Sequence, residues 1–381
     1  MSQLSGAPAE LVVAPVTITP TKPLTPTHIK GLLWTDVLVK ASARVASVRL
    51  AWSRRMAALT SQSADFWQHL DRTEPDTDWS TEPAGRLGER YVRFHAARPK
   101  SLSADPGYSA DPGYLARADR DGWVHPAGLR MLDHWRAELA LLGVDAQGLT
   151  DDRPLAGTAD LVLDALAERR LLIDHSRYGG PVHLDGARWG LPLRQLIGAD
   201  GRPNYLLPIL RELLPSIRAD RAFLLVHDTD ITADYLLLER VLAVFGARVS
   251  RLALSRVPVE GAARSSRYGG WAGATLTDLS AVSGSASRAG YRLGMRLYFA
   301  GVLHRRSAQS FRMPLLRRCV GRAARLLDGA PDGGDEATRR LAGVLARMRA
   351  QRGYVDPYRL TSSLLGERLL PLSPAVREIY T

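Results

Sequence analysis

Two short apolar stretches on either side of a helical pattern constrain the fold of this chain more than any other feature. Residues 222–227 read AFLLVH and residues 249–254 read VSRLAL, and each has the length and apolar content of a buried strand. Between them, residues 230–246 have the polar start and the glycine end of a helix. Strands that alternate with helices indicate a parallel sheet that is covered on both faces. The sequence therefore predicts an α/β fold.

The N-terminal part of the chain extends this pattern. Residues 1–10 are small and polar, and we expect them to be flexible. Residues 11–18, LVVAPVTI, predict the first strand of the sheet. Residues 19–28 contain three prolines and cannot form the interior of a helix. Apolar residues at helical spacing then predict one long helix over residues 28–59.

The middle of the chain has a different character. Residues 71–125 are rich in acids, proline and glycine, and the sequence SADPGY occurs twice in tandem at residues 103–114. Two copies of a six-residue unit are too few for a solenoid, so we expect two turns in an exposed insertion. Helical patterns return at residues 126–144 and 158–172.

Positive charge is concentrated in the C-terminal third, where strand patterns stop after about residue 280. The formal net charge of the chain is +12, and residues 288–352 hold 15 arginines, no lysine and four acids. Residues 311–327 predict a helix with one apolar face and a mostly opposite face that carries Arg317, Arg318, Arg322 and Arg325. Such a face favours an RNA partner, because arginines neutralise phosphates. The alternative is that this face is an ordinary solvated surface, because the whole chain favours arginine: 47 of its 51 basic residues are arginine.

Composition and cysteine content exclude several classes of protein. With 45% hydrophobic and 24% charged residues, the 381-residue chain is neither disordered nor fibrous. The single cysteine, Cys319, excludes an intramolecular disulfide framework and a multi-cysteine zinc site. We find no signal sequence and no apolar run of about 18 residues, so we expect a soluble cytoplasmic protein without a membrane partner.

We divide the chain into a flexible N-terminus (1–10), an α/β domain (11–285) with an insertion at about 71–150, and a basic helical domain (286–381).

Three motifs follow one another in an informative order. The first is PLTPTHIK at residues 23–30, with TD at residues 35–36. The second is GARW at residues 186–189, with DG at residues 200–201 and then Tyr205. The third is the strand and helix start FLLVHDTDITADY at residues 223–235, followed by ARSSRYG at residues 263–269.

In this order and spacing, the motifs resemble the catalytic domain of class I aminoacyl-tRNA synthetases, and within that class arginyl-tRNA synthetases. The resemblance covers roughly residues 11–285 and matches the family's Pro-Leu-His-x-Gly-His loop, its Gly-Ala-x-Trp stretch and its mobile KMSKS loop. It implies a Rossmann-type parallel sheet of the class I synthetase (HUP-like) kind, followed by an α-helical C-terminal domain. It also implies ATP-dependent activation of an amino acid, with ATP and Mg²⁺ as cofactors and tRNA or another RNA as a possible partner.

The resemblance assigns roles to individual residues. His28 would donate to a phosphate at the start of a helix. Lys30, Arg264 or Arg267 would replace the lysine of the mobile loop, because that position is Ala263 here. The implied nucleotide-binding residues are Thr25, His28, Asp228, Asp230, Ser265, Ser266 and Gly269, and the implied substrate-binding residues are Thr19, Tyr205 and Asp234. No protein-bound metal is implied. We expect His28, Asp230 and Ser265 to converge on one cleft at the carboxyl ends of the strands.

The substrate side departs from arginyl-tRNA synthetases. The polar groups that hold arginine in that family are replaced here by Ala14, Thr19 and Ile209, and only Tyr205 remains. Burying a guanidinium without a carboxylate costs on the order of several kcal/mol, so we predict that free arginine is not the substrate. The leading hypothesis is a stand-alone ligase that passes the activated acyl group to an amine or hydroxyl, in small-molecule biosynthesis. The alternative is a non-catalytic synthetase paralogue that binds RNA or regulates, since the loop lysine and one loop histidine are missing.

Overall fold

A four-stranded parallel sheet lies at the centre of the molecule. The computed structural model describes residues 8–97, 113–263, 265–281, 284, 286–329, 335–365 and 372–381. The strands are β1 (Glu10–Pro15), β2 (Ser47–Leu50), β6 (Arg221–Asp228) and β7 (Arg248–Leu254), in the order β2-β1-β6-β7. In register, Leu11 lies opposite Val48 on one side and Ala222 on the other. The predicted α/β fold with a parallel sheet is confirmed.

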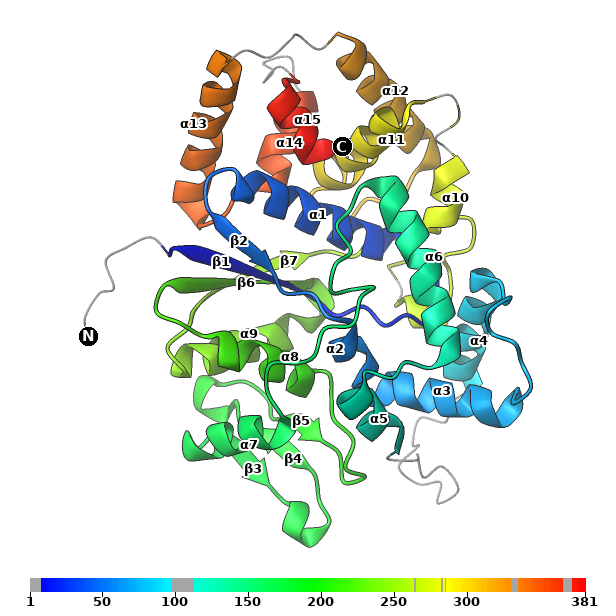
Figure 1. Ribbon diagram of the computed structural model, residues 1–381, viewed down its shortest axis with the longest axis vertical. Helices are drawn as coiled ribbons and strands as arrows, with labels where there is room; N and C mark the ends of the chain where they lie inside the picture. The colour runs from blue at the N-terminus through cyan, green and yellow to red at the C-terminus, as the bar shows by residue number, and fades with distance from the viewer. Residues whose placement is uncertain are drawn as a thin grey trace.

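Alternation along the strands decides which helices cover each face of the sheet. Val12 and Phe223 belong to a core formed with α8 (Leu206–Leu213) and α9 (Thr232–Val244). Leu11 and Val13 face the other way and pack with Trp34 of α1 (Pro26–Ala43). Figure 1 shows α1 on one face of the sheet, with α8 and α9 on the other. The carboxyl ends of the strands are thereby left open for a site.

The long helix predicted over residues 28–59 is wrong beyond residue 43. Helix α1 ends at Ala43, strand β2 follows, and a short helix α2 spans Arg54–Ala58. Val48 and Leu50 alternate with polar neighbours, which suits a strand. Pairing with β1 provides hydrogen-bond partners for the backbone groups of this segment. The helix predicted over residues 158–172 is also too long, because α7 ends earlier (Ala159–Glu168).

The described part of the insertion consists of helices joined by irregular segments. Helix α3 (Ser61–Thr73) leads into the insertion, which contains α4 (Ala84–Ala97), α5 (Gly113–Asp121) and α6 (Pro126–Leu142). These four helices gather at one end of the sheet in Figure 1. Phe66, Tyr91 and Trp135 are fully buried in the core that these helices share with α1. The tandem SADPGY repeat lies outside the described residues except for Gly113 and Tyr114.

A second, smaller sheet was not predicted. Strands β3 (Leu172–Asp174), β4 (Val182–Leu184) and β5 (Arg194–Ile197) pair antiparallel and lie beyond α8 and α9 in Figure 1. The α/β domain expected over residues 11–285 therefore contains a second sheet beside the parallel one. Strands of three or four residues are too short to leave a clear alternating pattern. Their hairpin turns end in Gly179 and Gly190, whose positive φ angles of 72° and 67° suit glycine.

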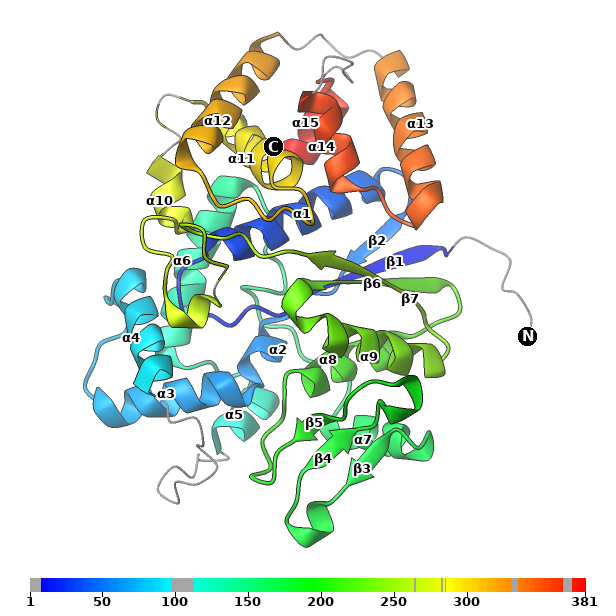
Figure 2. The same ribbon diagram turned by 180° about the vertical axis from the view of Figure 1, so that it is seen from behind.

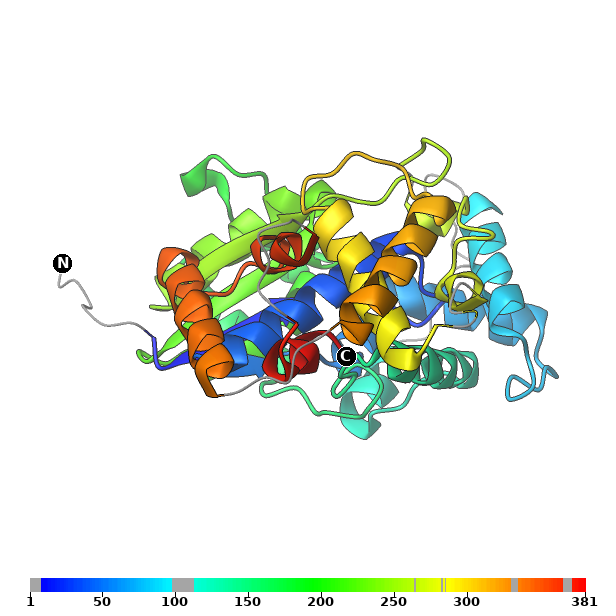
Figure 3. The ribbon, with the colours of Figure 1, turned by 90° about the horizontal axis from the view of Figure 1, so that it is seen from above.

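After about residue 280, every helix or strand in the described part of the chain is a helix, as predicted. The helices from residue 276 onward are α10 (Leu276–Ser280), α11 (Arg288–Arg296), a π-helix (Leu297–Val302), α12 (Met313–Asp328), α13 (Asp335–Arg352), α14 (Pro357–Leu365) and α15 (Pro374–Tyr380). Figures 1 and 3 show α11 to α15 on the side of α1 that faces away from the sheet. No helix in the described part of the chain is long and apolar enough to cross a membrane.

One buried ion pair fastens these helices to the α/β core. Arg296 of α11 has no exposed surface, and its Nε atom donates to Asp36 of α1 at 3.0 Å. The same guanidinium donates to the carbonyl of Leu142 at the end of α6, at 2.9 Å. Asp36 also pairs with Lys40 one helical turn later, at 3.2 Å. Three separate parts of the chain therefore meet at this single arginine.

Candidate active site

Two joined cavities lie where the strands of the central sheet end. The larger has a volume of about 370 Å³ and the smaller about 310 Å³. His28, Asp228, Arg256, Ser265 and other residues line both. In Figure 2 the chain leaves β7 and passes the start of α1 before it reaches α10, and the Val257 amide donates to the Thr27 hydroxyl at 3.1 Å. The start of α1 and the mobile-loop segment therefore face each other across the cavities.

His28 has a fixed protonation state in this setting. Thr25 caps α1, and its backbone N–H donates to Nδ1 of His28 at 3.2 Å. Burial, and then the charges of Lys22 and Arg256, hold the pKa of His28 well below its usual range. Because a backbone N–H only donates, Nδ1 is bare and the neutral ring carries its proton on Nε2. His28 thus offers one N–H donor and no positive charge.

Lys22 is a site residue that the sequence analysis missed. It lines the larger cavity, is only 5% exposed, and its ammonium lies 4.9 Å from the ring centre of Tyr91. Burial lowers the pKa of Lys22 to about 7, and the charges of Arg267 and Arg256 add to the shift. No carboxylate among the described residues forms an ion pair with it. One signal was available: Lys22 is among only four lysines in a chain that otherwise uses arginine.

Lys30, for which we expected a catalytic role, lies outside the two cavities. The residue is buried. Its ammonium donates to the carbonyl of Ser255 at 3.0 Å and lies 3.5 Å from the carbonyl of Arg305. Burial lowers the pKa of Lys30 to about 8, which the charge of Asp228 partly opposes. Lys30 therefore joins α1 to the segment after β7 and to the loop before α12.

The remaining nucleotide-side residues are distributed over both cavities. Ser266 lines both, Arg267 the larger, and Thr25 and Gly269 the smaller. Arg264 lies outside the described residues. Asp230 lines neither cavity, but its carboxylate pairs with Nε of Arg256 at 2.7 Å. His28 and Ser265 thus meet at one cleft, whereas Asp230 reaches it only through Arg256.

Among the described residues, the larger cavity has one lining carboxylate, Asp228. Burial raises its pKa to about 6, against the opposing charges of Arg256 and Lys30. Thr19 and Tyr205 line the larger cavity. Asp234 does not line this cavity. Its carboxylate accepts a hydrogen bond from the Tyr205 hydroxyl and forms an ion pair with Arg194. Ala14 of β1 and Ile209 of α8 are buried in one core and line neither cavity.

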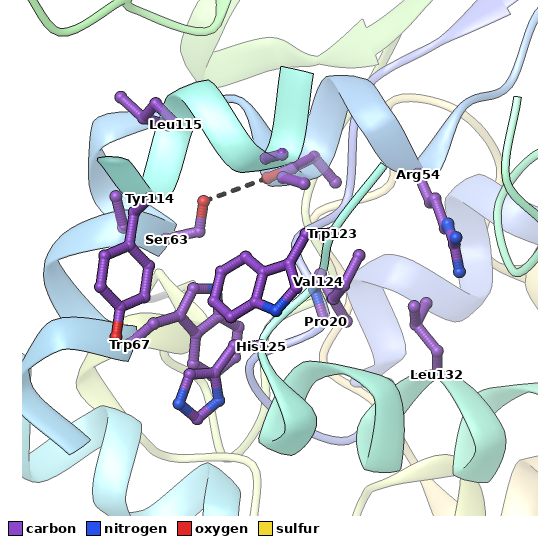
Figure 4. Close-up of a pocket in the computed structure, with 14 residues that line it drawn as sticks. Pro20, Arg54, Ser63, Trp67, Tyr114, Leu115, Trp123, Val124, His125 and Leu132 are labelled. Carbon is purple, nitrogen blue, oxygen red and sulfur yellow. Dashed lines mark hydrogen bonds between the residues drawn. The ribbon is translucent and has the colours of Figure 1, made fainter. Parts of the chain in front are cut away.

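A third pocket lies apart from this site. Figure 4 shows it among Trp67, Trp123 and His125, with Ser63 donating to the carbonyl of Ala57. Its volume of about 20 Å³ is enough for roughly one water molecule. It is therefore a packing gap between α2, α3 and the insertion helices.

A parallel sheet with a capped histidine helix at its carboxyl edge, a serine-rich loop opposite and a helical C-terminal region define a class I aminoacyl-tRNA synthetase-like fold. Among solved structures, the chain is similar to the arginyl-tRNA synthetase of Thermus thermophilus, with a TM-score of 0.56 and 16% identity over 97% of this chain and 74% of that chain. It is also similar to the arginyl-tRNA synthetase of Plasmodium falciparum, with a TM-score of 0.51 and 11% identity over 86% of this chain and 58% of that chain. Neither a protein-family model nor a curated protein sequence matches. At these identities the comparison shows the fold, and the resemblance inferred from the motifs is confirmed at that level.

Proposed function

We propose that this chain uses ATP to activate the carboxyl group of an amino acid other than free arginine, and passes the acyl group to an amine or hydroxyl acceptor. The observation that carries the proposal is the set of donors around the two joined cavities. Lys22, Arg256 and Arg267 supply positive charge, and His28 supplies a neutral N–H. This set suits a triphosphate.

The reaction needs positioning and charge stabilisation rather than covalent work by the protein. A carboxylate oxygen of the amino acid attacks the α-phosphorus of ATP. The bond from that phosphorus to the oxygen bridging to the β-phosphate breaks, and pyrophosphate leaves with the bonding electron pair. Nε2 of His28 donates to a phosphate oxygen, and the N-terminus of α1 adds its dipole. Lys22 and Arg267 hold the developing charge of pyrophosphate.

Other residues complete the nucleotide side. Asp228 accepts from the ribose hydroxyls, and the hydroxyls of Ser265 and Ser266 donate to phosphate oxygens. Magnesium enters bound to the triphosphate, which is the usual way that Mg²⁺ reaches such sites. Among the described residues no group of three or more His, Cys, Asp or Glu side chains is arranged to hold a metal.

ATP–pyrophosphate exchange tests the proposal directly. The full chain is assayed with each of the standard amino acids, with and without total tRNA. We expect exchange with at least one amino acid and none with arginine, since Asp228 is the one carboxylate among the described residues that line the larger cavity, and the positive charges of Arg256 and Lys30 already act on it. If no amino acid supports exchange in either condition, the alternative of a non-catalytic paralogue is the better reading.

The pKa of Lys22 predicts that ATP binding takes up a proton. In the free protein the Lys22 amine has a pKa of about 7, so it is mostly neutral at pH 8. A bound triphosphate favours the charged form and raises this pKa, so one proton must be taken up and the affinity for ATP falls as pH rises above about 7. Calorimetry at pH 8 in two buffers of different ionisation enthalpy measures the uptake. Lys22→Met should abolish it, and equal heats for the wild-type protein in both buffers would contradict the prediction.

RNA as donor or acceptor is part of the proposal, and two basic surfaces support it. Arg317, Arg318 and Arg325 of α12 are exposed, but Arg322 donates to the carbonyl of Leu365 at 2.9 Å and holds α14. A groove of about 610 Å³ lies nearby, between α13, α14 and the loop after the π-helix. It is lined by His304, Arg305, Arg306, Gln351, Arg352, Asp356, Tyr358 and Arg359. Four arginines and one acid, beside an exposed tyrosine ring, suit a phosphate backbone and a stacked base.

Two matched triple variants separate the groove from the α12 face. Arg305, Arg306 and Arg359→Gln should weaken tRNA binding and reduce the slope of log affinity against log salt by about 0.7–0.9 per lost phosphate contact. Arg317, Arg318 and Arg325→Gln removes the same charge from α12 and should have the smaller effect. Wild-type protein without salt-dependent tRNA binding at low ionic strength would remove RNA from the proposal.

A further inference from the structure

Gly88 and Val92 of α4 pack closely against the loop that follows β7. A Cβ atom added at Gly88 would lie 2.9 Å from Cη2 of Trp271 and 2.8 Å from Cδ of Pro23, closer than real Cβ atoms lie to other heavy atoms. One turn further along α4, Cγ1 of Val92 lies 3.5 Å from the position of a Cβ atom at Gly269. Figure 2 shows this part of the loop beside α4. Only glycine at position 88 therefore leaves room for Trp271 and Pro23 in their present places.

Trp271 connects this contact to the two cavities. Its side chain is only 9% exposed, and its indole N–H donates to the carbonyl of Ser266 at 2.9 Å. Ser266 lines both cavities, and the next residue, Arg267, lines the larger one. Because the hydrogen bond from Trp271 holds the backbone at Ser266, the position of the indole ring against Gly88 determines where Ser266 and Arg267 lie.

Helix α4 also contacts Lys22, another cation of the site. Tyr91 of α4 lines the larger cavity, and the ammonium of Lys22 lies 4.9 Å from the centre of its ring. Cβ of Lys22 lies 3.3 Å from the position of a Cβ atom at Gly88. One helix of the insertion therefore packs against Lys22 directly and reaches Arg267 through Trp271.

We infer that Gly88 and Trp271 are positioning residues for the proposed reaction, and that they hold Ser266 and Arg267 where these contact the triphosphate. The inference rests on the proposed function and names the residues that place its loop groups. Neither residue has to touch the reacting atoms, because both act through the loop backbone. Since catalysis at such a site depends on positioning, a displacement of the loop by about 1 Å lowers the rate by about 10²-fold.

Gly88→Ala in the full chain tests the inference, because its methyl group forces the end of the Trp271 ring away from α4. We expect kcat for ATP–pyrophosphate exchange to fall by about 10- to 100-fold. In calorimetry, the affinity for α,β-methylene-ATP should fall about tenfold and that for adenosine should stay within about twofold, because adenosine has no phosphate for the loop to contact. A general folding defect would weaken the binding of both ligands.

Gly85→Ala is the matched control. It makes the same substitution in the same helix, but a Cβ atom added at Gly85 meets no atom within 4 Å. Exchange by this variant should stay within about twofold of the wild-type rate. Limited trypsin digestion of the ligand-free chain compares the two variants without ATP. We expect cleavage after Arg267, identified by mass spectrometry, to be about fivefold faster in Gly88→Ala than in Gly85→Ala, because a displaced loop is more open to the protease.

Trp271→Phe provides a second variant that does not crowd the helix. Phenylalanine has no Cη2 atom, so it leaves room for a methyl group at position 88, but it also lacks the N–H that donates to Ser266. When Gly88→Ala and Trp271→Phe are combined, the loss of exchange activity should therefore be smaller than the product of the two single losses.

Two results would overturn the inference. One is a Gly88→Ala variant that matches Gly85→Ala in both exchange and cleavage, and the other is a double variant in which the single losses multiply. If the wild-type protein neither binds α,β-methylene-ATP nor supports exchange, the proposed function fails instead. The cleavage comparison needs no nucleotide and still tests the contact between α4 and the loop, so the two failures are distinguishable.

Discussion

Lys22→Met should lower the rate of ATP–pyrophosphate exchange by about 10²- to 10³-fold. Removal of one preorganised donor from a site of developing charge typically has an effect of this size. Lys22 is the buried cation that lines the larger cavity without an acidic partner among the described residues. Its loss leaves Arg267 as the main charge for pyrophosphate, and a guanidinium does not reproduce the geometry of an ammonium. Initial rates at saturating ATP and amino acid measure the effect.

A control and a rescue make this result specific. Lys40→Met removes a lysine that pairs with Asp36 and donates to the carbonyl of Gly143 at 2.8 Å, and Lys40 lines neither cavity. It should change exchange little. Adding Ala263→Lys to Lys22→Met restores a lysine in the mobile-loop segment and should recover part of the rate. Equal rates for Lys22→Met and Lys40→Met would rule out a role of Lys22 in the reaction.

Arg296→Met should destabilise the fold by about 3–5 kcal/mol, because it leaves the buried carboxylate of Asp36 without its main partner. The carbonyl of Leu142 loses a donor as well. The midpoint of urea unfolding, followed by circular dichroism, measures the change. Arg325→Met makes the same chemical substitution at an exposed position and should stay within about 0.5 kcal/mol of the wild-type protein.

A double variant separates the buried charge from packing in this experiment. Asp36→Leu combined with Arg296→Met replaces the pair by apolar side chains and should recover much of the lost stability, since the cost comes mainly from an unpaired buried charge. A double variant that is less stable than Arg296→Met alone would show that the hydrogen bonds of the guanidinium to the chain dominate.

The parts of the fold that the sequence predicted are those with strong local signals. The continuous apolar run at residues 222–227 and the helix after it could be identified because their lengths and ends are distinctive. Thr25 and Pro26 are the N-cap and first residue of α1, and that local chemistry places His28 at the cavity. Strand β2 was missed because its four residues fit a helical spacing as well as an alternating one. Only pairing with β1 decides between the two.

The candidate site was harder to predict because its chemistry depends on distant partners. Lys30 follows His28 by two residues, yet its hydrogen bonds reach Ser255 and Arg305, 225 and 275 residues away. Lys22 lies in a proline-rich stretch that had no helical or strand pattern to suggest burial. Its lowered pKa arises from packing against α4 and from Arg267 and Arg256, none of which is near in sequence.

The hydrogen bonds of Ser255 connect the segment that lines the cavities to the loop that lines the arginine-rich groove. Its N–H donates to the carbonyl of Arg305 at 2.7 Å, and its hydroxyl lies 2.9 Å from the carbonyls of Arg305 and Ser307. The next residue, Arg256, lines both cavities, while Arg305 lines the arginine-rich groove between α13 and α14. If the loop that contains Arg305 and Ser307 moves, its hydrogen bonds to Ser255 therefore transmit the movement to Arg256 at the cavities. If a ligand in the groove changes the affinity of the cavities for their ligand, the ligand in the cavities changes the affinity of the groove by the same factor.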